Sequence, residues 1–173
     1  MTGILLVGGA SSRFGSPKAL AQLNGETLAE RAWQVLGEAA EDRIAVGKRQ
    51  DGLALPFPVL DDGSETRAAL AGLVAGLRAA PTELCVVLPV DTPLVTPALL
   101  QDLADACADA AAPAATPLPG AYRKRALPVL ERRLVTGELA LHEALDELDT
   151  ARLEVDASLL VNVNTPDDLR RLG

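Results

Sequence analysis

The feature that most constrains the fold is the alternation of short apolar runs with amphipathic segments along the first 112 residues. Short, wholly apolar runs are typical of strands buried on both faces of a sheet, and they lie here at 3–7, 44–46, 59–60 and 84–88. Apolar residues that recur every three or four positions predict helices over 28–40, 70–77 and 97–103. Because strands alternate with helices, we predict an α/β sandwich built on a doubly wound, mostly parallel sheet.

The second half of the chain follows a different pattern. Residues 104–115 contain eight alanines in twelve positions, and because Pro113 interrupts them we interpret this stretch as a helix end and a connection. The later predicted elements are helices over 128–135 and 138–148, strands over 152–155 and 159–163, and a last helix from Pro166. No fixed-period repeat and no Pro-, Gly- or Ser-rich linker is present, so residues 1–173 are expected to form a single domain.

Charge and composition exclude several classes of protein. A net charge of −8, with only one Trp, one Tyr and two Phe, argues against a surface that binds nucleic acid. The apolar stretch at residues 4–7 is too short for a signal peptide or a membrane span. Cys85 and Cys107 belong to no zinc or redox motif. We therefore expect a cytoplasmic protein that contacts neither nucleic acid nor membrane.

The first predicted strand runs into a glycine-rich loop that ends at Lys18. In a doubly wound sheet, the carboxyl ends of the strands open into the crevice where ligands bind. Backbone N–H groups at Gly8 and Gly9 can approach an anion closely, and Arg13 and Lys18 add positive charge, so the loop indicates a phosphate site. Its spacing is neither that of a P-loop nor that of a dinucleotide-binding fingerprint. The alternative is an ordinary glycine turn with two solvated cations.

Acidic side chains follow two other predicted strands. Asp91 comes after the strand at 84–88, and a carboxylate beside a phosphate site suits Mg²⁺. The alternative is that Asp91 only caps the turn before the next helix. Asp61 and Asp62 follow the strand at 59–60 and can accept hydrogen bonds from a base or a ribose, although an Asp-Asp-Gly turn also uses such carboxylates locally.

Two asparagines near the end of the sequence form a further candidate site. Asn162 and Asn164 are two positions apart along a predicted strand, so their side chains are expected to project to the same side. Thr165-Pro166 then begins a helix, and the alternative is that Asn164 or Thr165 is only its cap. The single histidine, His142, falls within a predicted helix and is assigned no role.

Three segments are distinctive in combination. They are Leu6-Val7-Gly8-Gly9 with Ser11, Arg13, Gly15 and Lys18; Asp91-Thr92-Pro93-Leu94; and Asn162-Val163-Asn164-Thr165-Pro166-Asp167-Asp168-Leu169. In this order they resemble the molybdenum cofactor guanylyltransferase family. The resemblance implies a Rossmann-like nucleotidyltransferase fold and an enzyme that joins GMP from GTP to molybdopterin with Mg²⁺, releasing pyrophosphate. It also implies transient contact with proteins that deliver the cofactor or receive it.

The resemblance further implies a role for individual residues. The implied nucleotide-binding residues are Leu6, Val7, Gly8, Gly9, Lys18, Asp62 and Asp91. The implied catalytic residues are Arg13, Lys18 and Asp91, of which Asp91 is the Mg²⁺ ligand, and the implied acceptor-binding residues are Asn162 and Asn164. Gly47 stands where some relatives carry an asparagine that contacts nucleotide. Two alternatives stay open: a cytidylyltransferase that acts on the same pterin or another small phosphorylated acceptor, and a non-catalytic nucleotide-binding regulatory module.

Overall fold

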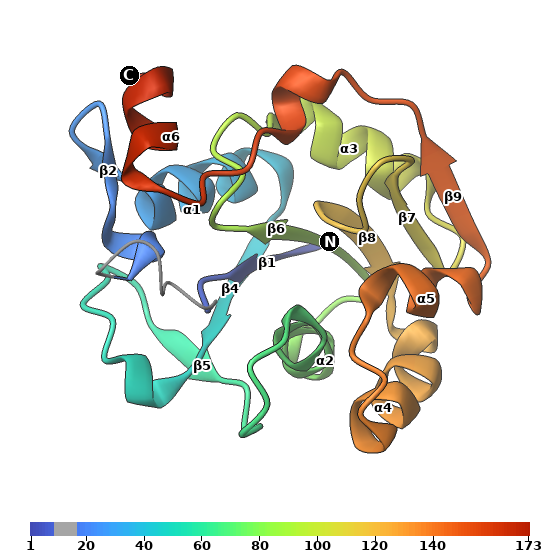
Figure 1. Ribbon diagram of the computed structural model, residues 1–173. Helices are drawn as coiled ribbons and strands as arrows, with labels where there is room; N and C mark the ends of the chain where they lie inside the picture. Colours follow the sequence, from blue (N-terminus) through green and yellow to red (C-terminus); the bar gives the residue numbers. More distant parts are fainter. Residues whose placement is uncertain (9–16) are drawn as a thin grey trace.

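A central sheet with helices on both faces forms the body of the protein (Figure 1). The computed structural model describes residues 1–8 and 17–173. The strands of the sheet are β1 (Thr2–Leu6), β4 (Asp42–Gly47), β5 (Val59–Asp61), β6 (Leu84–Pro89), β7 (Ala110–Pro113), β8 (Gly120–Arg123) and β9 (Thr150–Leu153). A separate hairpin pairs β2 (Gln22–Leu23) with β3 (Glu26–Thr27).

The strands of the sheet lie in the order β5-β4-β1-β6-β8-β7-β9. Neighbours are parallel from β5 through to β6 and again between β7 and β9. Strand β8 runs antiparallel to both β6 and β7. The sheet is therefore mostly parallel, as predicted, and β4, β1 and β6 end at one common edge, where sheets of this kind bind their ligands.

Helices cover the two faces of the sheet in two groups (Figure 1). Helices α1 (Leu28–Ala39) and α3 (Pro97–Ala106) pack on one face, and α2 (Ala69–Ala79), α4 (Leu127–Thr136) and α5 (Leu141–Asp146) pack on the other. The last helix, α6 (Pro166–Leu172), lies against β2. Short 3₁₀ helices are η1 (Lys18–Leu20), η2 (Arg49–Asp51), η3 (Lys124–Ala126) and η4 (Ala157–Leu160). This arrangement confirms the doubly wound sandwich.

Alternate side chains of the central strands fill the two halves of the core. On β1 and just beyond it, Leu5 and Val7 pack with α1 and α3, whereas Ile4 and Leu6 pack with α2. Each of these four side chains is at most 5% exposed. Because both faces of the strand are covered, the sequence is apolar at every position rather than at every second one.

Local sequence signals set several element boundaries. Thr27 begins α1 with a capping box, in which its side chain accepts from Glu30 N and the Glu30 carboxylate accepts from Thr27 N. Thr96 caps α3 by accepting from Leu99 N. Asn24 and Gly25 have φ values of 55° and 88°, the left-handed conformations that a tight hairpin turn requires.

The interpretation of residues 104–115 was wrong, because the alanine-rich stretch contains strand β7, Ala110–Pro113. Alanine favours helices intrinsically, but here Ala110, Ala111 and Ala112 are fully buried within the sheet. Pro113 is tolerated because it ends the strand, beyond the last residue paired with β8. The neighbouring strand β8 had no predicted counterpart.

The predicted strand at 159–163 was also wrong. Residues Ala157–Leu160 form η4, which Asp156 caps by accepting from Ser158 N at 2.9 Å. The chain then runs without regular structure to α6, which begins at Pro166 as predicted. Asn162 and Asn164 therefore do not owe their positions to a strand.

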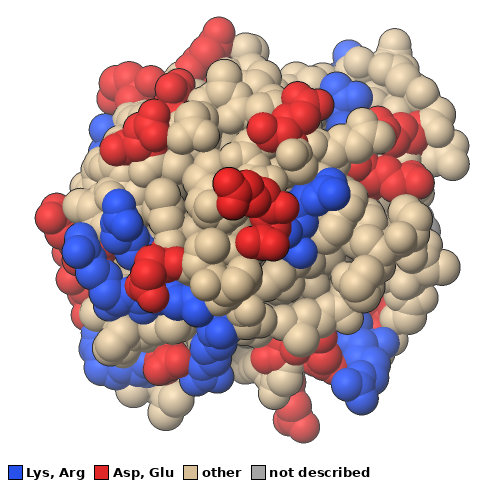
Figure 2. Space-filling model, turned by 180° about the vertical axis from the view of Figure 1, so that it is seen from behind, with Lys and Arg blue, Asp and Glu red and all other residues tan. Residues whose placement is uncertain are grey.

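Basic and acidic side chains are interspersed on the face seen from behind (Figure 2). Lys and Arg gather toward the lower left of that view with Asp and Glu among them. Arg78 of α2 forms an ion pair with Glu131 of α4, and Arg132 of α4 forms one with Glu147. Arg125 of η3 forms an ion pair with Asp109. Among the described residues, no helix has the length and hydropathy needed to cross a membrane.

Candidate active site

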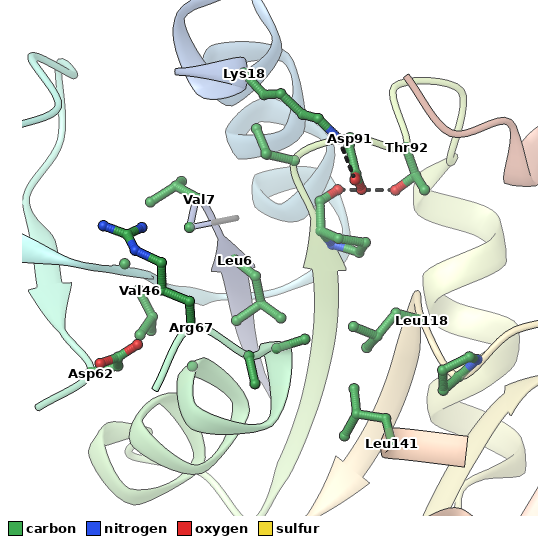
Figure 3. Close-up of a pocket in the computed structure, with 18 of the residues that line it drawn as sticks. Leu6, Val7, Lys18, Val46, Asp62, Arg67, Asp91, Thr92, Leu118 and Leu141 are labelled. Carbon is green, nitrogen blue, oxygen red and sulfur yellow. Dashed lines mark hydrogen bonds and ion pairs between the residues drawn. The ribbon is translucent and has the colours of Figure 1, made fainter. Parts of the chain in front are cut away.

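A pocket of about 420 Å³ opens at the edge of the sheet where β1, β4 and β6 end (Figure 3). Asp62 and Arg67 lie on one side of it and Leu118 and Leu141 on the other, with Lys18 and Asp91 above (Figure 3). We call the first side, with Lys48, Asp62 and Arg67, the charged arm. The second side, with Pro117, Leu118 and Leu141, is the apolar arm.

Asp91 follows β6, and its carboxylate faces Lys18 at the mouth of the pocket (Figure 3). The turn after β6 is closed by Thr92, whose hydroxyl donates to the Pro89 carbonyl at 3.0 Å. The next helix is capped by Thr96. Neither structural task falls to the Asp91 side chain, so the cap interpretation of Asp91 is wrong.

Lys18 opens η1, the first described helix after β1. Its Nζ donates to Asp91 Oδ2 at 3.2 Å and to Asn164 Oδ1 at 2.9 Å. The Lys18 side chain is 14% exposed, which argues against a solvated surface cation. Gly9 and Arg13, the other predicted members of this loop, lie outside the described residues.

The segment between η4 and α6 brings the two asparagines to the site. Val163 is fully buried, and its backbone N donates to the Asp91 carbonyl at 2.8 Å. Asn162 lines the pocket, and the Asn164 side chain bonds Lys18. Thr165, rather than Asn164, caps α6 by accepting from Asp168 N. The Asn164 side chain therefore lies beside Lys18 and does not cap the helix.

Backbone hydrogen bonds order the wall formed by Leu6, Val7 and Gly8. Leu6 O accepts from Val90 N and Val7 N donates to Val46 O, both at 3.0 Å. All three residues line the pocket, and their binding of nucleotide stays a prediction. A Cβ on Gly8 would lie 3.6 Å from the Gly47 Cα, an ordinary contact, so Gly8 is not required by packing within the described residues.

Asp62 lies in the charged arm, and part of its carboxylate is used locally. Its Oδ1 accepts from Ser64 N at 2.9 Å, the turn bond that the Asp-Asp-Gly sequence suggested. The same oxygen accepts from Lys48 Nζ at 2.8 Å. The presence of Lys48 in the pocket was not predicted, because Lys48 and Arg49 are adjacent in the sequence and such a pair of cations is usually exposed on the surface. Asp61 has different partners. Its Oδ1 accepts from Gly63 N, and its Oδ2 lies 3.6 Å from Nε of the exposed Arg49.

The apolar arm was also missed by sequence reasoning. Leu118 belongs to the segment before β8, and Leu141 begins α5. Tyr122 on β8 is fully buried, and its hydroxyl donates to the Pro117 carbonyl at 3.2 Å, which ties this wall to the sheet. Because β8 had no predicted counterpart, nothing in the sequence placed these residues beside the first strand.

Two side-chain oxygens, Asp91 Oδ2 and Asn164 Oδ1, accept hydrogen bonds from Lys18 at the pocket mouth. Within the residues that the structure describes, no group of three or more His, Cys, Asp or Glu side chains is placed to hold a metal ion.

Near the site, the backbone N–H of Asn164 and the Thr165 hydroxyl lower the pKa of the Asp168 carboxyl below its usual value. This carboxylate holds the chain at Asn164 in place.

Solved structures share this fold. Molybdopterin-guanine dinucleotide biosynthesis protein A from Archaeoglobus fulgidus superposes with a TM-score of 0.85 at 28% identity, over 99% of this chain and 96% of that chain. A 2-C-methyl-D-erythritol 4-phosphate cytidylyltransferase from Thermus thermophilus, 19% identical, shares the fold with a TM-score of 0.77 over 98% of this chain and 95% of that one. The fold, with its pocket at the sheet edge, is that of a Rossmann-like nucleotidyltransferase.

Sequence comparison places the chain more narrowly. Residues 3–154 match the family described as the MobA-like NTP transferase domain. A probable molybdenum cofactor guanylyltransferase from Chloroflexus aggregans is 34% identical over 98% of this chain and 92% of its own length. One from Aquifex aeolicus is 28% identical over 97% of this chain and 88% of its own length. The chain belongs to the MobA-like NTP transferase family and is a nucleotidyltransferase.

Proposed function

We propose that this protein transfers GMP from GTP to molybdopterin, which forms the guanine dinucleotide cofactor and releases pyrophosphate. The observation that carries the proposal is the meeting of Lys18, Asp91 and Asn164 where a charged arm and an apolar arm join. Such a junction suits the phosphates through which two substrates are linked. The names of the relatives, molybdenum cofactor guanylyltransferase and molybdopterin-guanine dinucleotide biosynthesis protein A, support these particular substrates.

The two arms differ in the chemistry that they offer to a substrate. The charged arm has the Asp62 carboxylate, and the wall formed by Leu6, Val7 and Gly8 adds backbone groups. Both suit the directional hydrogen bonds of a base and a ribose. The apolar arm presents Leu118 and Leu141, which suit the flat faces of a ring system. The nucleoside therefore occupies the charged arm, and the acceptor occupies the apolar arm.

The donor set at the pocket mouth fits Mg²⁺. Asp91 Oδ2 and Asn164 Oδ1 both point at the Lys18 ammonium, so two oxygen ligands already converge on one positive charge. Mg²⁺ is commonly held by one or two carboxylates together with substrate phosphates, and Asp91 is the carboxylate that would hold it here. A bound Mg²⁺ would neutralise phosphate charge at this position.

The reaction requires no protein nucleophile. An oxygen of the acceptor's terminal phosphate attacks the α-phosphorus of GTP, the bond from that phosphorus to the bridging oxygen breaks, and pyrophosphate leaves with the oxygen. The acceptor phosphate is already ionised at neutral pH, so no general base is needed. Lys18 holds the phosphates and offsets their charge, and by its position in the loop Arg13 is proposed to share this task with the backbone of Gly9.

The test is pyrophosphate release from GTP, CTP and ATP, each with molybdopterin, with and without Mg²⁺. We expect release that requires the acceptor and Mg²⁺ and is fastest with GTP. Faster release with CTP would favour a cytidylyltransferase, and nucleotide binding without release would favour a regulatory module. Transient contact with proteins that deliver the cofactor or receive it stays a prediction, as does a cytoplasmic location.

A further inference from the structure

Lys48 has no part in the proposed reaction, although it is a charged group buried in the wall of the pocket. It directly follows β4 and is 6% exposed. Its Nζ donates to Asp62 Oδ1 and to the Thr66 carbonyl, each at 2.8 Å, and also to the Ser64 carbonyl. An ammonium group has three hydrogens, and three acceptors hold it in one orientation.

The partners of Lys48 all belong to the segment 62–66, which joins β5 to α2. The start of this segment is also tied to the end of β4, because Asp62 N donates to the Gly47 carbonyl at 3.0 Å. Arg67, Ala68 and Ala69, the first residue of α2, follow at once and line the pocket. Lys48 therefore fastens one wall of the charged arm to the end of β4.

The pair of Lys48 and Asp62 is buried on both sides. The two side chains are 6% and 5% exposed. Removing one member of a buried ion pair leaves the other charge without compensation, which is strongly unfavourable. Without the Lys48 charge, the Asp62 carboxylate is expected to turn toward water and take the segment 62–66 with it.

We propose that Lys48 is a positioning residue for the nucleoside half of the nucleotide. It holds Asp62 and the segment 62–66 in the form that lines the charged arm, and it acts on neither the phosphates nor the reacting atoms. The inference rests on the proposed function, because it takes the charged arm as the place of the nucleoside. Loss of Lys48 then weakens nucleoside binding and leaves the chemical step intact.

The experiment compares Lys48→Gln, which removes the charge but keeps donors, with wild type and with Lys124→Gln. Lys124 opens η3 and is not among the residues that line the pocket, so it is a matched control. Calorimetry measures Kd for whichever of GTP, CTP and ATP wild type binds, and for its nucleoside. We expect Lys48→Gln to raise both Kd values by a similar factor, about tenfold or more, since small displacements of binding groups have effects of this order. The kcat at saturating nucleotide should change less than about threefold, and Lys124→Gln should match wild type.

The possible outcomes separate the two proposals. A wild type that binds no nucleotide contradicts the proposed function. A folded Lys48→Gln protein that binds as wild type does overturns the positioning role alone, and so does a loss seen for the nucleotide but not for the nucleoside. If Lys48→Gln fails to fold, Lys48→Arg keeps the charge on a bulkier, displaced group. It should raise both Kd values relative to wild type, and unchanged values would overturn the inference.

Discussion

Replacement of Asp91 by asparagine separates structural from chemical roles, because the two residues are nearly equal in size. The Lys18–Asp91 ion pair is partly exposed, with side chains 14% and 28% accessible, so its loss should cost about 0–1 kcal/mol of folding free energy. For a domain of this length that corresponds to a fall in Tm of at most about 4 °C. Asparagine also keeps an oxygen that can accept from Lys18.

The effect of Asp91→Asn on catalysis should be far larger than its effect on stability. Loss of one preorganised hydrogen-bond donor of an oxyanion hole lowers the rate by about 10²–10³-fold, and we expect a loss of the same order here. Pyrophosphate release at saturating GTP and molybdopterin, measured across a Mg²⁺ titration, tests this. Thermal unfolding and calorimetry with GTP test whether the fold and nucleotide binding survive.

Asp102→Asn is the matched control, because Asp102 is an exposed carboxylate on α3. It should leave both the turnover and the Mg²⁺ dependence unchanged. An Asp91→Asn protein with full activity and the wild-type Mg²⁺ response would refute the metal role of Asp91. A fall in Tm of more than about 10 °C would refute the reasoning from partial exposure, since it would show that Asp91 is a structural residue.

Further predictions concern the pocket mouth, the glycine at the end of β4 and two titratable groups. Lys18→Met should lower turnover by about 10²–10³-fold in a folded protein, measured as pyrophosphate release, and a loss below threefold would show a merely structural cation. Gly47→Ala should lower both Tm and nucleotide affinity, because a Cβ there would lie 2.8 Å from Val7 Cγ2 on the pocket wall, and an unchanged Kd by calorimetry would count against this. The Asp168 carboxyl has a pKa below its usual value of 3.8, so its stabilisation of the α6 start is present above pH 3.8 and is lost as the pH falls through the lower, folded-state pKa. The amide shift of Asn164 should report that loss by NMR, and the pH response should be absent in Asp168→Asn. Burial raises the pKa of the Cys85 thiol to about 11, so iodoacetamide at pH 8 should label Cys85 only after unfolding in urea, as peptide mass spectrometry can verify.

The parts of the fold that the sequence predicted are those in which local pattern and tertiary setting agree. Strands β1, β4 and β6 each contain a short apolar run whose two faces are covered, and the positions of these runs were enough to bring Asp91 to the pocket. Strand β7 was missed because alanine favours helices, and only its burial between β8 and β9 makes a strand the better choice.

The residues of the candidate site also divide into those that could be predicted from local sequence and those that could not. Lys18 and Asp91 could be predicted because each directly borders a recognisable strand or loop. Asn164 lies at the site for a reason other than the predicted strand. The Val163 backbone N donates to the Asp91 carbonyl, and the Asp168 carboxylate accepts from Asn164 N. Lys48 could not be predicted, since its burial depends on acceptors at 62–66 that approach from another part of the chain.

The bond between Lys18 and Asn164 joins residues 146 positions apart. During synthesis on the ribosome, the first strand and its loop emerge long before Asn164 has been translated. The pocket mouth is therefore incomplete in every nascent chain that stops short of Asn164, even when the strands of the sheet have already paired. Products of premature termination upstream of this residue would keep much of the pocket lining but lack the bond that joins Lys18 to Asn164.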